Sequence, residues 1–334
     1  MPQENLNKIW NAGKYFEPKP EQPTKEPTPD ETKPSNVKRK INVAKAFIPQ
    51  QEDPFKKKVE AVMKGIESAS VLGEPKEESV SVDEEVIVGT GQDNIGTNLV
   101  AGESIRVEGN VGDWTGYSMS GGKIRVKGEA GVLTGDSMSG GEIYVEGDAR
   151  DWTGIRMSGG EIHIRGNGGY QVGDSMSGGE IHVEGDAKDW AGDHMSGGKI
   201  HVKGNAGSMT GQDMSGGEIH VEGNAGDLVG HSMSGGEIHV RCNVGGQVGD
   251  SMSGGKIHVK GNAGDLAGRS MSGGILRIDG DIASFGKTAF TSENKGTIIW
   301  KEETIWEKGA FTEVGKELYG RRHNPFAKRR IRVK

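Results

Sequence analysis

The chain has 334 residues, a formal net charge of −7 and 57 glycines, and only 5% of its residues are aromatic. The net charge argues against general nucleic-acid binding, which depends on basic surfaces. The single cysteine, Cys242, excludes a disulfide framework within the chain, and we find neither a signal peptide nor an apolar run of membrane length. We therefore expect a cytoplasmic protein that does not enter a membrane.

Residues 1–52 are predicted to form a disordered extension. Residues 17–40 are rich in Pro, Glu, Lys and Thr and contain too few apolar side chains to build a core. A short aromatic cluster, Trp10 with Tyr15 and Phe16, precedes them. Because large aromatic side chains are typical anchors of interfaces, Trp10 is a candidate contact to a partner protein. An unattached terminus is the alternative.

Residues 53–83 are predicted to form a short amphipathic helix and a linker. Asp53 is a suitable N-cap, and Pro54 fits the first helical position. We expect this helix to cap the first coil of the domain that follows, with docking on a partner as the alternative. Its apolar face would consist of Phe55, Val59, Val62, Met63 and Ile66.

Residues 84–300 are dominated by one phrase, Met-Ser-Gly-Gly, which occurs nine times with a period of 19 residues. A short fixed period indicates one structural unit stacked many times. After each phrase, polar and β-branched residues alternate, as at Ile162 and Ile164, which predicts a half-buried strand. Glycines such as Gly204, Gly207 and Gly211 follow, where we expect tight turns or positive φ. We interpret the phrase itself as the turn before each strand.

No helical periodicity separates the predicted strands, so each repeat forms one coil. The predicted fold is all-β: a right-handed parallel β-helix, or solenoid, of about ten 19-residue coils. Atypical copies near residues 100–107 and 290–300 are typical of terminal capping coils. Residues 301–334 are expected to form a C-terminal cap and a basic tail.

The tail, residues 321–334, contains seven basic residues and no acidic one. Such a segment is able to contact phosphates or acidic protein surfaces, so it is the one part of the chain expected to be capable of nucleic-acid binding. A solvated terminus, or one that folds back on the acidic solenoid, is the alternative.

One histidine column occupies the outward face of six consecutive predicted strands. A row of imidazoles can bind metal or respond to pH, but a linear row diverges, whereas zinc ligands converge in a tetrahedron. Two residues further on, charges alternate in sign from coil to coil, as at Glu146, Arg165 and Glu184, which favours correct strand register. We therefore expect a solvated or partner-covered face, with candidate interface residues His163, His182, His201, His220, His239 and His258.

Three tryptophans, Trp114, Trp152 and Trp190, occupy one site in alternate coils. The same site holds glutamine at Gln171 and Gln247, which indicates a partly exposed edge. We expect the tryptophans to pack between coils or to contribute to a subunit interface, with a ligand platform as the alternative.

No catalytic, cofactor-binding or metal-binding residue is assigned. The segment 192–199 resembles a phosphate loop only superficially, because Ile200 follows its lysine where Ser or Thr would hold magnesium. The sequence contains no G-x-S-x-G elbow, no H-E-x-x-H motif and no cysteine cluster. We expect the chain not to be catalytic by itself.

The segment 204–226 begins and ends with the sequence Gly-Asn-Ala-Gly and contains Met-Ser-Gly-Gly-Glu-Ile-His-Val between them. It resembles the GXGXG β-helix shared by the β-helical subunit of formylmethanofuran dehydrogenase and the C-terminal domain of the glutamate synthase large subunit. The resemblance covers about two thirds of the chain, and residues 252–264 are most similar to the dehydrogenase subunit.

The resemblance implies a non-catalytic structural subunit of a tungsten or molybdenum formylmethanofuran dehydrogenase, which reduces carbon dioxide to formylmethanofuran in methanogenic and related archaea. It also implies that other subunits of this oxidoreductase hold the pterin metal cofactor and the iron–sulfur clusters, and that this chain binds none. A glutamate synthase domain and a stand-alone solenoid scaffold in another assembly are the alternatives.

Overall fold

The computed structural model describes residues 85–87 and 91–323, and side chains from residue 91 to residue 319. Trp10, the helix expected within residues 53–83 and residues 324–334 of the basic tail lie outside the described residues.

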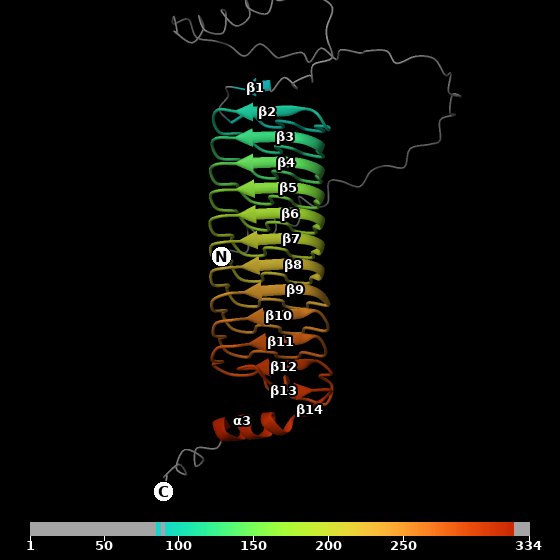
Figure 1. Ribbon diagram of the computed structural model, residues 1–334, viewed down its shortest axis with the longest axis vertical. Helices are drawn as coiled ribbons and strands as arrows, with labels where there is room; N and C mark the ends of the chain where they lie inside the picture. Colours follow the sequence, from blue (N-terminus) through green and yellow to red (C-terminus); the bar gives the residue numbers. More distant parts are fainter. Residues whose placement is uncertain (1–84, 88–90, 324–334) are drawn as a thin grey trace, which may run out of the picture. The chain divides into compact units, whose positions relative to one another are not determined.

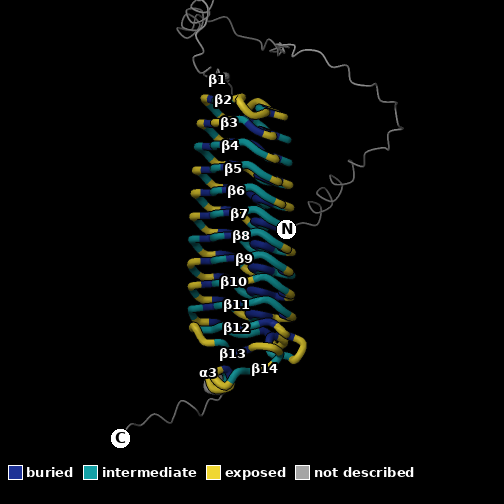
Figure 2. The backbone as a smooth tube through the Cα atoms, turned by 45° about the vertical axis from the view of Figure 1, so that its right-hand side comes forward, coloured by how far each residue is buried: buried dark blue, intermediate teal, exposed yellow. Residues whose placement is uncertain are grey.

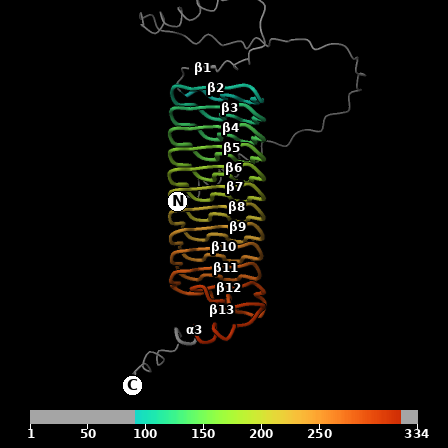
Figure 3. Tube along the Cα trace, in the orientation of Figure 1, coloured from blue at the N-terminus to red at the C-terminus, as the bar shows by residue number. Residues whose placement is uncertain are grey.

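Each coil contributes one strand to a single sheet, and the strands follow one another in chain order (Figure 1). The tube trace shows the same order, because its colour changes steadily from one end of the stack to the other (Figure 3). The parallel strands are β1 (Glu85–Ile87), β2 (Ser104–Val107), β3 (Ser120–Val126), β4 (Ser139–Val145), β5 (Ser158–Ile164), β6 (Ser177–Val183), β7 (Ser196–Val202), β8 (Ser215–Val221), β9 (Gly235–Val240), β10 (Lys256–Val259), β11 (Ile275–Ile278) and β12 (Thr297–Trp300).

Neighbouring strands pair in parallel with a register of 19 residues through the regular coils. Ile143 lies opposite Ile162, which lies opposite Ile181. In Figure 1 the strands on the near side run towards the left while the chain descends, so the coil is right-handed. The predicted fold, a right-handed parallel β-helix of about ten coils, is confirmed.

The Met-Ser-Gly-Gly phrase does not form a turn before the strand in β3 to β8, and our interpretation of it was wrong there. These strands begin at the serine of the phrase. The register then shifts before the residue that follows the two glycines, so the phrase forms a bulged first part of the strand. In β10 and β11 the strand begins only after the phrase.

The methionine and the glycines of the phrase interlock between coils. Met157 is fully buried, and a Cβ on Gly179 of the next coil would lie 2.7 Å from its Cε and 2.7 Å from the carbonyl oxygen of Gly160. A Cβ on Gly178 would meet the carbonyl oxygen of Ser158. The same arrangement recurs along the stack, where buried residues line the inner side of each coil (Figure 2). The phrase repeats because each methionine fills space that the next pair of glycines leaves free.

Glycine is required at the corners for two different reasons. Gly211 has a φ of 69°, as expected. Gly204 and Gly207 are not among the residues with positive φ, so positive φ is not what requires glycine there. A Cβ on Gly204 would lie 2.5 Å from the carbonyl oxygen of Gly185. Glycine stands there because the coils stack too closely for a side chain.

Two sites in the corner before each phrase hold non-glycine residues with positive φ. Trp152 has a φ of 60° and Arg156 a φ of 56°, and the equivalent residues of the other regular coils behave alike. Such backbone costs free energy for residues with a Cβ. Both backbone N–H groups donate to the next coil, to Tyr170 O at 2.8 Å and to Asp174 O at 2.8 Å. These bonds between coils offset the cost.

A ladder of side-chain amides and carboxylates supports a further corner. Asn205 Oδ1 accepts the backbone N–H of Asn224 at 2.9 Å, and Asn224 Oδ1 accepts that of Asn243 at 3.1 Å. Each side chain therefore satisfies a backbone donor of the following coil, which favours stacking without a slip in register.

Antiparallel strands and a helix cover the C-terminal end of the sheet. β12 pairs with β13 (Glu303–Glu307), β13 pairs with β14 (Ala310–Phe311), and α3 (Glu313–His323) follows. Phe290, Trp306, Phe311 and Tyr319 pack as a cluster, with ring centroids 4.7–5.5 Å apart. This cap blocks the edge at which another strand could pair. The sequence did not predict its helix.

Candidate functional site

The six histidines form one continuous column on the outer face of the sheet. Each lies opposite the next across a strand pair from β5 to β10. All six are half-buried, and Tyr144 continues the column on β4. The structure therefore brings together the histidines that the sequence predicted to share a face.

The imidazole rings do not share one orientation. His163 and His182 stack with centroids 4.7 Å apart and planes 5° apart, and His220 and His239 stack at 4.8 Å and 9°. His201 lies edge-on to both of its neighbours, with interplanar angles of 80° and 84°. The column is thus divided into stacked pairs by rings that are turned away.

The charge two residues before each histidine accounts for the ring orientation. Lys199 precedes His201 and Lys256 precedes His258, whereas a glutamate precedes each of the other four. Those four imidazoles lie close to the glutamate of their own strand. The Nε2-to-carboxylate distances are 3.2 Å for His163 and Glu161, 3.4 Å for His182 and Glu180, 2.6 Å for His220 and Glu218, and 3.4 Å for His239 and Glu237.

The two histidines that follow a lysine turn to an acid on the next coil. His201 Nε2 lies 3.1 Å from Glu222, and His258 Nε2 lies 2.8 Å from Asp279. Every imidazole of the column therefore has a carboxylate partner, and the position of that carboxylate decides which way the ring points.

The column of alternating charges also links neighbouring coils. Glu108 pairs with Lys127 at 2.7 Å and Glu184 with Lys203 at 3.1 Å. The hydrogen bond from Lys127 is the main cause that lowers the pKa of Glu108. Such exposed pairs contribute little stability each. Their alternation disfavours a shift of one coil, because like charges would then meet.

Two hollows lie along this face, between the histidines and the alternating charges. One has a volume of about 340 Å³ and is lined by residues that include Tyr144, His163 and Arg165. The other has a volume of about 290 Å³, and its lining includes His220 and Arg241. Together they form a polar face that can receive side chains from a partner.

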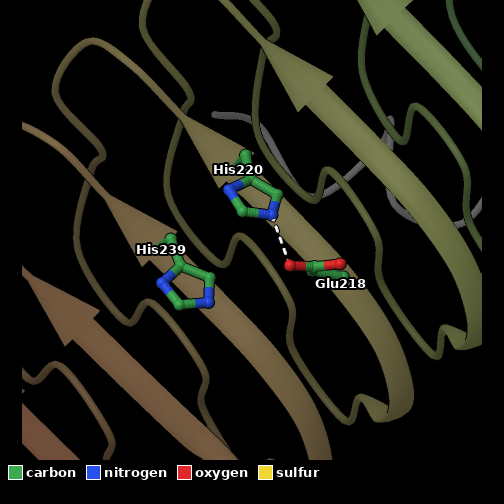
Figure 4. A group of neighbouring side chains, drawn as sticks. All are labelled: Glu218, His220 and His239. Atoms are coloured by element: carbon green, nitrogen blue, oxygen red, sulfur yellow. Dashed lines mark hydrogen bonds and ion pairs between the residues drawn. The ribbon is translucent and has the colours of Figure 1, made fainter.

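Two groups among the described residues gather three metal-ligand side chains within 4.8 Å. One consists of Glu218, His220 and His239 (Figure 4). The other consists of Asp174, Asp193 and His194 in a corner. Sequence reasoning missed both groups. The linear pattern shows which residues share a face, but it does not show that Glu218 lies beside two neighbouring imidazoles or that Asp174, Asp193 and His194 meet in a corner.

Asp193 differs from the other buried acids of its column. Asp136 is held by Arg156 at 2.7 Å, and Asp250 is held by Arg269. Asp193 has no arginine partner among the described residues: His194 Nδ1 lies 2.9 Å from Oδ1, but the geometry does not satisfy a hydrogen bond. Burial raises the pKa of Asp193 to about 6, although its side chain is close to an imidazole.

The tryptophan site is partly exposed, as predicted. Trp114 is exposed, whereas Trp152 and Trp190 are half-buried. Trp152 Nε1 donates to Gln171 Oε1 of the next coil at 2.8 Å, and Trp190 packs against Tyr170 with ring centroids 6.3 Å apart. Packing between coils is therefore observed, and the glutamine at this site serves as a hydrogen-bond partner. A role in a subunit interface stays a prediction.

No helix among the described residues is long and apolar enough to span a membrane. No protein-family model matches the sequence, and no curated protein is significantly similar to it.

Proposed function

We propose that this chain is a non-catalytic structural subunit of a tungsten or molybdenum formylmethanofuran dehydrogenase in the cytoplasm. The pterin metal cofactor and the iron–sulfur clusters would then reside on its partner subunits. The proposal depends on the resemblance of the repeat to the GXGXG β-helix of that enzyme's β-helical subunit. The observation that supports a structural role is the interlock of each methionine with the glycines of the next coil, because this interlock assigns the repeated phrase to packing between coils.

A role in binding a partner also agrees with the positions at which the coils differ from one another. The inner columns are almost invariant from coil to coil, while charges and ring orientations vary on the histidine face. A partner could recognise such a face through the two hollows and the half-buried imidazoles. Charged and polar surfaces of this kind provide specificity more than affinity.

Affinity purification from the native host, followed by metal analysis, tests this proposal. A formylmethanofuran dehydrogenase subunit should recover partner chains that contain tungsten or molybdenum together with iron, and it should lack activity alone. Recovery of the chain without partners would contradict the proposal and favour a stand-alone scaffold.

The same experiment distinguishes the glutamate synthase alternative. A domain of that enzyme would be recovered with an amidotransferase and a flavin-dependent synthase part. Reversing charges on the histidine face, with Glu184→Lys and Glu222→Lys together, should reduce partner recovery if this face forms the interface. Asp281→Lys is the matched control, because Asp281 is exposed and is not among the residues that line the two hollows.

A further inference from the structure

We propose that Glu218, His220 and His239 form a binding site for a divalent transition-metal ion of the zinc class on the outer face of β8 and β9. The three side chains come from two adjacent coils, and their ligand atoms lie within 4.8 Å of one another. Figure 4 shows the two imidazoles side by side with the glutamate next to them. A bound ion would therefore bridge the two coils.

The two rings stack face to face on neighbouring coils, so a shared ion, which each imidazole would bind in its own ring plane, requires them to tilt towards each other. Their planes differ by 9°, and their centroids are 4.8 Å apart. Both rings turn Nε2 towards the glutamate of their own strand: His220 to Glu218 at 2.6 Å and His239 to Glu237 at 3.4 Å. Both nitrogen atoms thus lie on the same side of the column.

The donor set suits zinc and similar ions. Two imidazole nitrogens and one carboxylate oxygen are common zinc ligands, and water can occupy the remaining position. Zinc–nitrogen bonds are about 2.0–2.1 Å long, so two nitrogen ligands of a tetrahedral ion lie about 3.4 Å apart. Rotations about the side-chain torsions would have to bring the ligand atoms, which now lie within 4.8 Å of one another, to that spacing. The side chains have room for this, since 34% of Glu218, 42% of His220 and 35% of His239 is exposed.

Glu218 is better suited to bind the ion than its neighbour Glu237. Lys256 Nζ lies 2.5 Å from Glu237 and donates a hydrogen bond to that carboxylate. Among the described residues, the ion pair of Glu218 is with His220 alone. An approaching cation would therefore meet a carboxylate that no lysine occupies.

The rest of the column lacks this combination. His201 and His258 are turned towards acids of the next coil, so each presents a single imidazole to its carboxylate. His163 and His182 stack in a similar way, but their ligand atoms are not among the groups gathered within 4.8 Å. The other histidines of the column therefore serve as controls for metal binding at His220 and His239.

Zinc titration of the metal-free full-length chain by calorimetry tests the site. Three double variants are compared with the wild type: H220A with H239A, H163A with H182A, and H201A with H258A. We expect the first to lose one bound zinc ion per chain, and the other two to keep that ion with affinity within about threefold of the wild type. The single variant Glu218→Gln should weaken its binding at least tenfold.

Thermal unfolding with and without zinc provides a second measurement. Because the ion would join two coils, zinc should raise the melting temperature of the wild type and of both control variants, but not of H220A with H239A. The proposal is overturned if all three double variants lose zinc equally, or if none does. Circular dichroism of each metal-free variant confirms that the outward substitutions leave the solenoid folded.

Discussion

The inner and outer sides of the coils that contain β5 to β10 both have regular columns of side chains, but the two sides respond differently to their surroundings. On the inner face, the methionine of each phrase packs against the second glycine of the phrase in the next coil, and this close packing selects one side-chain conformation. On the outer face, the same residue occurs in six coils, yet His201 contacts an acid of the next coil and His220 an acid of its own strand, with their ring planes 84° apart. A repeated residue therefore has the same side-chain conformation in every coil only where close packing permits a single conformation.

The physical reason is the difference in freedom between core and surface. Close packing inside the coil excludes other rotamers. An outward imidazole has several rotamers of similar energy, so a nearby carboxylate is sufficient to select one.

The largest effect is expected for Gly179→Ala. The new Cβ would meet Met157 Cε and the carbonyl oxygen of Gly160, both at 2.7 Å, so we expect a loss of stability of about 3 kcal/mol. Gly102→Ala is the matched control, because Gly102 has a similar φ of 88° and no atom within 4 Å of its Cβ. It should cost only about 1 kcal/mol. Urea unfolding measures both, and equal losses would show that backbone strain alone requires these glycines.

An intermediate effect on stability is expected for replacement of Asp193, a buried acid. Its pKa of about 6 in the folded protein exceeds the ordinary value of 3.8. The folded state therefore binds this proton more tightly than the unfolded state, and the carboxyl group reduces stability as the pH rises from about 4 through 6. Asp193→Asn should stabilise the protein by about 2 kcal/mol at pH 8 and by much less at pH 4.

Asp136→Asn is the control with the opposite sign. Asp136 is equally buried but paired with Arg156, so its replacement should destabilise the protein at pH 8 by about 2 kcal/mol. Denaturant unfolding at the two pH values measures both variants. If both substitutions had the same sign, the distinction between paired and unpaired buried acids would be wrong.

The smallest effect on stability is expected for Lys199→Glu. The new carboxylate would lie two residues before His201, as in the coils where the ring turns to its own strand. We expect His201 to turn over and stack between His182 and His220, with stability changed by less than about 0.5 kcal/mol. A crystal structure of the variant measures the ring planes. The control Lys203→Gln leaves Lys199 unchanged, so the ring of His201 should stay directed at Glu222.

Much of the fold was predictable from the sequence because its signal is repeated in every coil. Strand residues such as Ile181 and Val183 and the period were visible in the pattern, whereas the helix of the C-terminal cap was not. The corners were less predictable. Positive φ at Trp152 and normal φ at Gly204 reverse the usual preference, because the closeness of the neighbouring coil matters more there than local backbone freedom.

The sequence predicted that the histidines form a column, but it did not predict how their rings are oriented. The sequence placed His220 and His239 on one face. It did not show that their rings stack while His201 turns away. The charge two residues before each histidine, positive at Lys199 and negative at Glu218, correlates with the ring orientation. Its effect depends on distances between coils, which the linear sequence does not contain.

The sequence by itself determined the coil, its period and the set of side chains on each face, because a residue that recurs every 19 positions in a solenoid must stack on its own copies. Only the tertiary structure decided how those copies meet. It set which glycines exclude a side chain, which acid lacks an arginine partner, and which imidazoles converge. These outcomes depend on contacts between coils of a few ångströms, where the positions of single atoms determine the energy.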